Sequence, residues 1–114
     1  MNIEFLYIPL VTGPIFLLGG LFLFKFPPKN INFLYGYRTK SSMKSQVRWD
    51  FAQIHSSKEM MKWGVFLTIL GLIGSILNLS KSHNLILGLV FLIISTISLI
   101  IQTEKAIKNK FDIE

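Results

Sequence analysis

Three long runs without a charged side chain constrain this chain more than any other feature. They cover residues 5–24, 64–80 and 84–103, which are 20, 17 and 20 residues long. An α-helix rises 1.5 Å per residue, so about 20 residues cross the roughly 30 Å hydrocarbon core of a bilayer. Soluble helices of this length carry a polar face, and these runs have none with charge. We therefore expect an all-α integral membrane protein with three transmembrane helices, at about residues 5–25, 63–80 and 84–103.

The first run lies where a secretory signal peptide would lie, but the residues on either side of it are not those of a signal peptide. Glu4 precedes it where a basic segment is usual, and Lys25-Phe26-Pro27-Pro28 follows it where a small-residue cleavage site is usual. We expect the run to remain as the first helix. Within it, Pro9 and Pro14 each remove a backbone donor and favour a kink.

The net charge of +6 is distributed unevenly, and this distribution predicts an orientation. Of the 12 Lys and Arg residues, 8 lie between residues 25 and 62 and 3 lie in the C-terminal tail. Because cytoplasmic segments of membrane proteins are enriched in Lys and Arg, we expect the 26–62 loop and the C-terminus in the cytoplasm of a bacterium. The N-terminus then lies outside the plasma membrane. We expect the lipid bilayer to be the partner of this basic charge. No nucleic-acid partner is expected, because no base-reading motif accompanies the basic residues. The 114 residues form one membrane domain, 1–114.

The polar segment between the first two runs is expected to have two parts. Residues 26–40 contain Pro27-Pro28 and no helical period, which predicts an ordered turn segment. Ser41 and Ser42 are N-cap candidates for a helix that begins directly after them. Apolar residues then return at helical spacing, and they are Met43, Val47, Phe51, Ile54 and Met61. We expect an amphipathic helix over about 43–60, lying on the membrane surface or against the bundle and running into the second transmembrane helix.

Aromatic residues near this segment suit the headgroup zone of a bilayer. They are Tyr35, Tyr37, Trp49 and Trp63.

The second and third runs each carry a face of small or weakly polar residues. These are Gly64, Thr68, Gly71 and Ser75 in one and Gly88 and Ser95 in the other. Such residues let membrane helices approach closely and form hydrogen bonds. They serve either packing within one bundle or the interface of a homo-oligomer. No ionisable residue lies inside the three runs, which argues against a proton-coupled transporter.

Catalytic and metal-binding patterns are weak. His55 and His83 are expected on opposite sides of the membrane, so one chain cannot bring them to one metal ion. The sequence His55-Ser56-Ser57 does not make a nucleophile and base, because consecutive helical residues point apart. The chain has no Cys and no glycine-rich phosphate loop. We expect no enzyme, no cofactor and no metal.

One stretch, from Asn32 to Gln53, is richer in specific side chains than a connecting loop needs. Gly36 suits a tight turn with positive φ, and Arg38 suits bidentate contact with a carboxylate, a phosphate or a helix C-terminus. Trp49 is a rigid amphipathic anchor. The simpler interpretation is that this stretch only ties the cytoplasmic helix to the membrane.

Eight residues of this stretch carry a resemblance to a known family. They are Asn32, Gly36, Arg38, Thr39, Ser42, Trp49, Ala52 and Gln53. In this order, between a first and a second membrane helix, they resemble the SdpI family of bacterial integral membrane proteins. The resemblance implies immunity to a secreted antimicrobial peptide, which makes a toxin peptide a partner. It also implies membrane signalling through a bound transcription repressor. Longer members have extra helices, and several have Pro where this chain has Lys40, a difference that counts against the repressor role.

The expected function is therefore SdpI-like immunity or signalling without catalysis. The expected motif or binding residues are Asn32, Gly36, Arg38, Thr39, Ser42, Trp49 and Gln53, with Arg38 and Trp49 as the central pair. One alternative is a small oligomeric transporter or channel subunit, assembled through the Gly64 and Gly71 face. Another is a protein that binds lipid headgroups through Arg38 and the basic loop.

Overall fold

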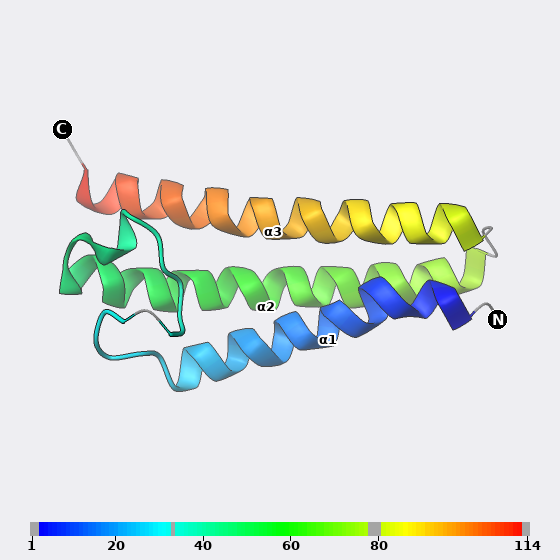
Figure 1. The fold of residues 1–114 in the computed structure, drawn as a ribbon, viewed down its shortest axis with the longest axis horizontal. Coiled ribbons are helices and arrows are strands. Elements are labelled where there is room, and N and C mark those ends of the chain that lie inside the picture. The colour runs from blue at the N-terminus through cyan, green and yellow to red at the C-terminus, as the bar shows by residue number, and fades with distance from the viewer. Residues whose placement is uncertain (1–2, 33, 78–80, 113–114) are drawn as a thin grey trace.

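Three long α-helices build the computed structural model, which describes residues 3–32, 34–77 and 81–112 (Figure 1). They are α1 (Ile3–Lys25), α2 (Gln46–Leu77) and α3 (Lys81–Phe111), and a short 3₁₀ turn, η1 (Ser42–Lys44), precedes α2. All three helices are long and apolar enough to cross a membrane. The all-α prediction is confirmed, with three helices long and apolar enough to span a membrane, although residues 78–80 of the second predicted span lie outside the described residues.

The helices lie side by side, with α2 between α1 and α3 in Figure 1. α1 crosses α2 obliquely, and α2 packs more extensively against α1 than against α3. The beginning of α1, the end of α2 and the beginning of α3 lie at one end of the bundle. The segment between α1 and α2 and the C-terminal end of α3 meet at the other, which we call the loop end.

α1 continues as one helix through Pro9 and Pro14. It ends at Lys25, where Pro27 and Pro28 follow. Proline disfavours helical backbone in the residue before it, so the pair stops the helix at this point. The chain then turns back across the beginning of α2 (Figure 1).

The helix expected before the second charge-free run forms the first part of α2, and it begins a few residues later than expected. Only residues 42–44 form the η1 turn, and a single helix of 32 residues then extends from Gln46 to Leu77. At 1.5 Å per residue this helix is roughly 48 Å long, against a hydrocarbon core of roughly 30 Å. About a third of it therefore extends past the membrane core at the loop end.

The buried face of this extension is also not the predicted one. Val47 is 64% exposed, whereas Trp49, Ala52 and Gln53 are 0% exposed. The loop lies on this side of α2, and its irregular backbone requires polar side chains as partners. Apolar periodicity therefore selected the wrong face.

Close contact between backbones holds α1 against α2. A Cβ added to Gly64 would lie 2.6 Å from the backbone nitrogen of Leu17, and one added to Gly71 would lie 2.5 Å from Cγ of Leu10. Any larger side chain at these positions would separate the helices.

The other small residues lie at related contacts or turn toward their own helices. A Cβ added to Gly88 of α3 would lie 3.0 Å from Cβ of Ile8 in α1. The hydroxyls of Thr68, Ser75 and Ser95 each donate to a carbonyl one turn earlier in the same helix. Ser95 is fully buried, and Ser75 is half-buried.

Candidate functional site

Gln53 and Trp49 of α2 hold the loop backbone. The Gln53 side chain accepts the Tyr37 N–H at 2.7 Å and donates to the Tyr37 carbonyl at 2.9 Å, as a neighbouring strand would. The Trp49 indole N–H donates to the Pro28 carbonyl at 2.8 Å. Both side chains are fully buried. Trp49 therefore lies beneath the loop, where its single donor satisfies a buried carbonyl.

Gly36 and Asn32 shape the turns of the loop. Gly36 has a φ of 107°, which L side chains rarely adopt. A Cβ there would lie 2.6 Å from Oε1 of Gln53. The Asn32 side-chain oxygen accepts the N–H groups of Leu34 and Tyr35 at 2.8 and 2.9 Å. These two residues fix the path that brings Tyr37 to Gln53.

Thr39 and Ser42 bond to each other at the start of η1. The Thr39 N–H donates to the Ser42 hydroxyl at 2.9 Å, and the Ser42 N–H donates to the Thr39 hydroxyl at 3.2 Å. Ser42 is fully buried. Ser41 occupies the N-cap position of η1, but its side chain makes no capping bond.

A carboxylate of α3, Glu104, gathers three hydroxyls of the loop. It accepts from the Tyr37 phenol at 2.7 Å, from the Thr39 hydroxyl at 2.8 Å and from the Ser41 hydroxyl at 2.6 Å. Hydrogen bonds to an ionised group are about twice as strong as neutral ones. Burial, together with the bond to Glu104, raises the pKa of the Tyr37 phenol, so Tyr37 remains a donor.

Arg48 links α2 to the loop and to the end of α3. Its Nε donates to the Ser41 carbonyl at 2.7 Å, and Nη1 lies 2.7 Å from a carboxylate oxygen of Asp112. The hydrogen bond from the Arg48 guanidinium holds the pKa of Asp112 below its ordinary value. We call this whole set of contacts the loop network, formed by Trp49, Gln53, Glu104, Arg48 and Asp112 with the loop residues that they bind.

Tyr37, Ser41, Arg48 and Glu104 belong to this network although they are not among the motif residues predicted from the sequence. A signal for three loop residues existed, since Tyr37, Thr39 and Ser41 are hydroxyl residues at alternate positions, which share one side in an extended segment. The intervening Arg38 is exposed. Arg38 and Trp49, predicted as a central pair, thus occupy the surface and the interior of the loop end, respectively.

An apolar recess of about 380 Å³ lies beneath the loop. Every helix contributes to it, and its lining comprises Phe16, Gly19, Phe22, Leu23, Tyr35, Gly36, Tyr37, Ser56, Met60, Thr96, Leu99 and Ile100. We call it the loop recess. Because Tyr37 belongs to both, the loop network fixes one wall of this recess.

The described residues offer no group of three His, Cys, Asp or Glu side chains that could hold a metal ion. His55 stacks on the Phe51 ring with centroids 5.6 Å apart. The hydroxyls of Ser56 and Ser57 donate to carbonyls of their own helix. These contacts satisfy the serines without using His55 as a base.

Comparison with known proteins places this chain in a family. The SdpI/YfhL protein family matches residues 29–102, which include all the motif residues from Asn32 to Gln53. The chain belongs to this family. It is 36% identical over 99 residues to the uncharacterised protein YfhL of Bacillus subtilis (strain 168), and the match covers 87% of this chain and 84% of that protein. No solved structure matches it. The predicted family membership is confirmed, and with its three apolar helices the chain is a multi-pass membrane protein of the SdpI/YfhL family.

Proposed function

We propose that this protein gives a bacterial cell immunity to a secreted antimicrobial peptide, without catalysis. The observation that carries the proposal is the loop recess, an apolar space of about 380 Å³ whose wall is fixed by the family-motif loop. A membrane-active peptide partitions into the bilayer and exposes apolar side chains there. Such side chains fit an apolar recess formed by three membrane helices.

The proposed orientation follows the basic residues. The loop end carries the 26–62 segment and the C-terminus, so the positive-inside rule puts this end in the cytoplasm and the N-terminus outside. A peptide that acts from within the bilayer then meets the loop recess near the cytoplasmic leaflet. Signalling to a cytoplasmic partner would use the same end.

The channel alternative has less support. It requires the small-residue face of α2 to contact a second copy, but Gly64 and Gly71 face α1 of the same chain. An oligomer would have to use other surfaces.

The test is protection of a sensitive bacterial strain that expresses the full chain, challenged with a panel of membrane-active secreted peptides. We expect survival to rise against at least one peptide. The variant Gly19→Leu fills the loop recess, since a Cβ there meets only the flexible end of Met60 at 3.0 Å, and protection should be lost. Leu18→Phe, at a neighbouring position that is 64% exposed, is the matched control and should still protect.

Two results would contradict the proposal. If no peptide distinguishes expressing from non-expressing cells, immunity is wrong. If Gly19→Leu protects as well as the original chain at equal expression, the loop recess is not the binding site.

A further inference from the structure

Apolar side chains are exposed where the chain leaves α1 and enters the loop. They are Phe22, Phe26 and Leu34, and we call them the loop patch. Phe22 and Phe26 are each more than half exposed, and their ring centroids lie 5.4 Å apart. Leu34 is 90% exposed, so its side chain makes almost no contact with the rest of the chain. Grouped apolar side chains of this kind mark a surface that another molecule covers.

Contacts with α1 fix the depth of the loop patch relative to the membrane span. The ring of Tyr35, the residue after Leu34, lies 6.4 Å from the Phe22 ring, and its phenol donates to the Phe26 carbonyl. Phe22 belongs to the charge-free run 5–24, and Phe26 lies two residues after that run, which corresponds to roughly 3 Å of helix. In Figure 1 the loop runs past the end of α1 and then comes back toward it. The patch therefore lies at the boundary between the hydrocarbon core and a headgroup layer of about 5–8 Å.

Basic residues border the loop patch. The segment 25–40 contains Lys25, Lys29, Arg38 and Lys40 and no acidic residue. Lys25 and Lys29 are exposed, and neither forms an ion pair within residues 3–32, 34–77 and 81–112. Basic residues directly beside a membrane helix are attracted to the anionic surface of a leaflet. An apolar surface bordered by such residues is typical of a segment that lies in the membrane interface.

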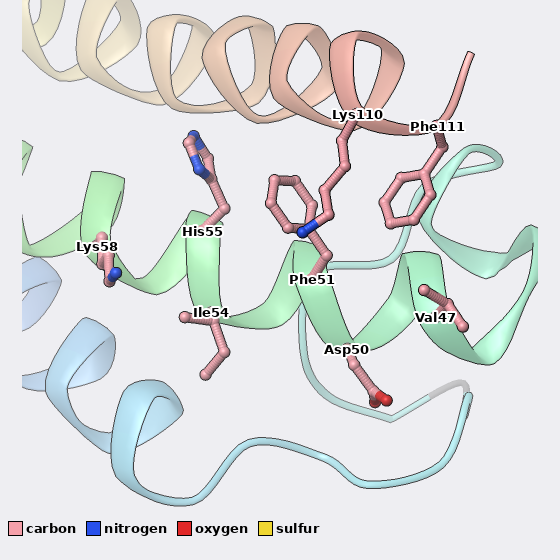
Figure 2. A pocket seen from close by; sticks show the side chains of 8 residues that line it. All are labelled: Val47, Asp50, Phe51, Ile54, His55, Lys58, Lys110 and Phe111. Atoms are coloured by element: carbon pink, nitrogen blue, oxygen red, sulfur yellow. The ribbon is translucent and has the colours of Figure 1, made fainter. Parts of the chain in front are cut away.

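Another exposed apolar side chain at the loop end, Val47, lies at a different depth. It belongs to the lining of a recess of about 400 Å³ between α2 and the end of α3 (Figure 2). Val47 precedes the charge-free run 64–80 by 17 residues, which corresponds to roughly 25 Å of helix and is well beyond the headgroup layer. The recess also has charged lining residues of both signs, Asp50, Lys58 and Lys110, which suit contact with water. Depth therefore distinguishes the loop patch from Val47, although both are exposed.

We propose that the loop patch inserts into the membrane leaflet at the loop end. Phe26 and Leu34 lie among the upper parts of the acyl chains, and Lys25 and Lys29 lie at the headgroup phosphates. The loop then has two attachments, the loop network on the side of α2 and α3 and the lipid leaflet on the side of α1. Because Tyr35 lines the loop recess, the leaflet helps to hold a wall of that recess. The insertion does not depend on the immunity function.

The chain contains no Cys, so a single introduced Cys can carry a fluorescent probe that reports its surroundings. Leu34→Cys in the full chain is labelled with nitrobenzoxadiazole and reconstituted into vesicles of phosphatidylcholine and phosphatidylglycerol. Because Leu34 is almost fully exposed, the label leaves the packing of the chain unchanged. Two quenchers are compared, a phospholipid spin-labelled on its acyl chain and iodide present on both sides of the membrane.

Two matched positions, each 64% exposed, calibrate the measurement. Leu18→Cys in the span of α1 is the membrane reference, and Val47→Cys at the start of α2 is the water reference. We expect the Leu34 probe to follow Leu18, with emission at shorter wavelength and quenching by the spin-labelled lipid about twofold or more stronger than at Val47.

Two results would overturn the proposal. Quenching of the Leu34 probe by iodide as strongly as at Val47, without quenching by the lipid, would place the loop patch in water. Protection from both quenchers would show that a protein surface, such as a second copy of the chain, covers the patch instead of the leaflet.

Discussion

The membrane part of the bundle and its loop end are held together in opposite ways. In the membrane part, α1 and α2 touch where side chains are missing, at Gly64 and Gly71. At the loop end, long polar side chains cross from one element to another, as Gln53 does to the loop and Glu104 does from α3. The contact between α1 and α2 depends on glycines that have no side chain. The contacts at the loop end depend on particular hydrogen-bond donors and acceptors.

The difference follows from how each part satisfies its backbone. Helices in hydrocarbon bond their own N–H and C=O groups, so their association needs only shapes that fit. The loop has irregular backbone, and its buried groups need partners from outside. Specific residue types are therefore concentrated at the loop end.

Substitution of the closest helix contact should produce the largest effect. Gly64→Leu places side-chain atoms where the α1 backbone lies, and we expect the free energy of unfolding to fall by about 3 kcal/mol or more. Thermal unfolding in detergent measures the change. Val65→Leu adds one methylene at an adjacent residue that is 46% exposed, and it should leave the melting temperature nearly unchanged. Similar melting temperatures for both variants would show that close backbone contact does not hold the bundle.

A smaller and more local effect is expected at the loop end. Glu104→Gln keeps the shape but removes the charge that three hydroxyls share, and we expect a loss of about 2 kcal/mol. Hydrogen exchange should increase at residues 37–44 and stay constant in the second half of α2. Gln102→Ala, at an exposed position two residues away, is the control. Uniform acceleration of exchange over all three helices would show that the two parts unfold together.

The smallest effect should appear at the edge of the loop network and depend on pH. Arg48 lowers the pKa of Asp112, so the bond adds stability that is fully present above the ordinary carboxyl value of 3.8. This stability is lost as the pH falls through the lowered pKa in the folded state. Asp112→Asn should therefore lower the melting temperature at neutral pH, and the gap should close in strong acid. The control variant is Asp50→Asn, because the Asp50 carboxylate accepts a hydrogen bond from the neutral Gln46 side chain and not from an arginine. A gap that widens in acid would contradict this assignment.

The three spanning helices could be predicted because absence of charge is a property of each run by itself. The buried face of the first half of α2 could not be predicted in this way, since a periodicity test looks for apolar residues. That face carries Trp49, Gln53 and Ser56. All three side chains donate hydrogen bonds to carbonyls, Trp49 and Gln53 to the loop and Ser56 to its own helix. Their burial is decided by a segment that folds over them.

Glu104 illustrates a second limit. Its three hydroxyl partners precede it by more than sixty residues, and no local pattern joins them. Within the motif stretch, Gly36 has the positive φ that its residue type favours, because a turn is a local event. Positions set by local backbone geometry could be anticipated, while those set by distant partners required the fold.

The continuity of α2 has a mechanical consequence. A single rod of 32 residues passes from the membrane core into the loop network without a joint. Its length of roughly 48 Å means that a tilt of about 10° about its membrane end displaces the other end by roughly 8 Å. Bilayer thinning, or a molecule bound between the helices, that tilts α2 would thus move its loop end sideways. Arg48 and Gln53 would move with that end of the helix.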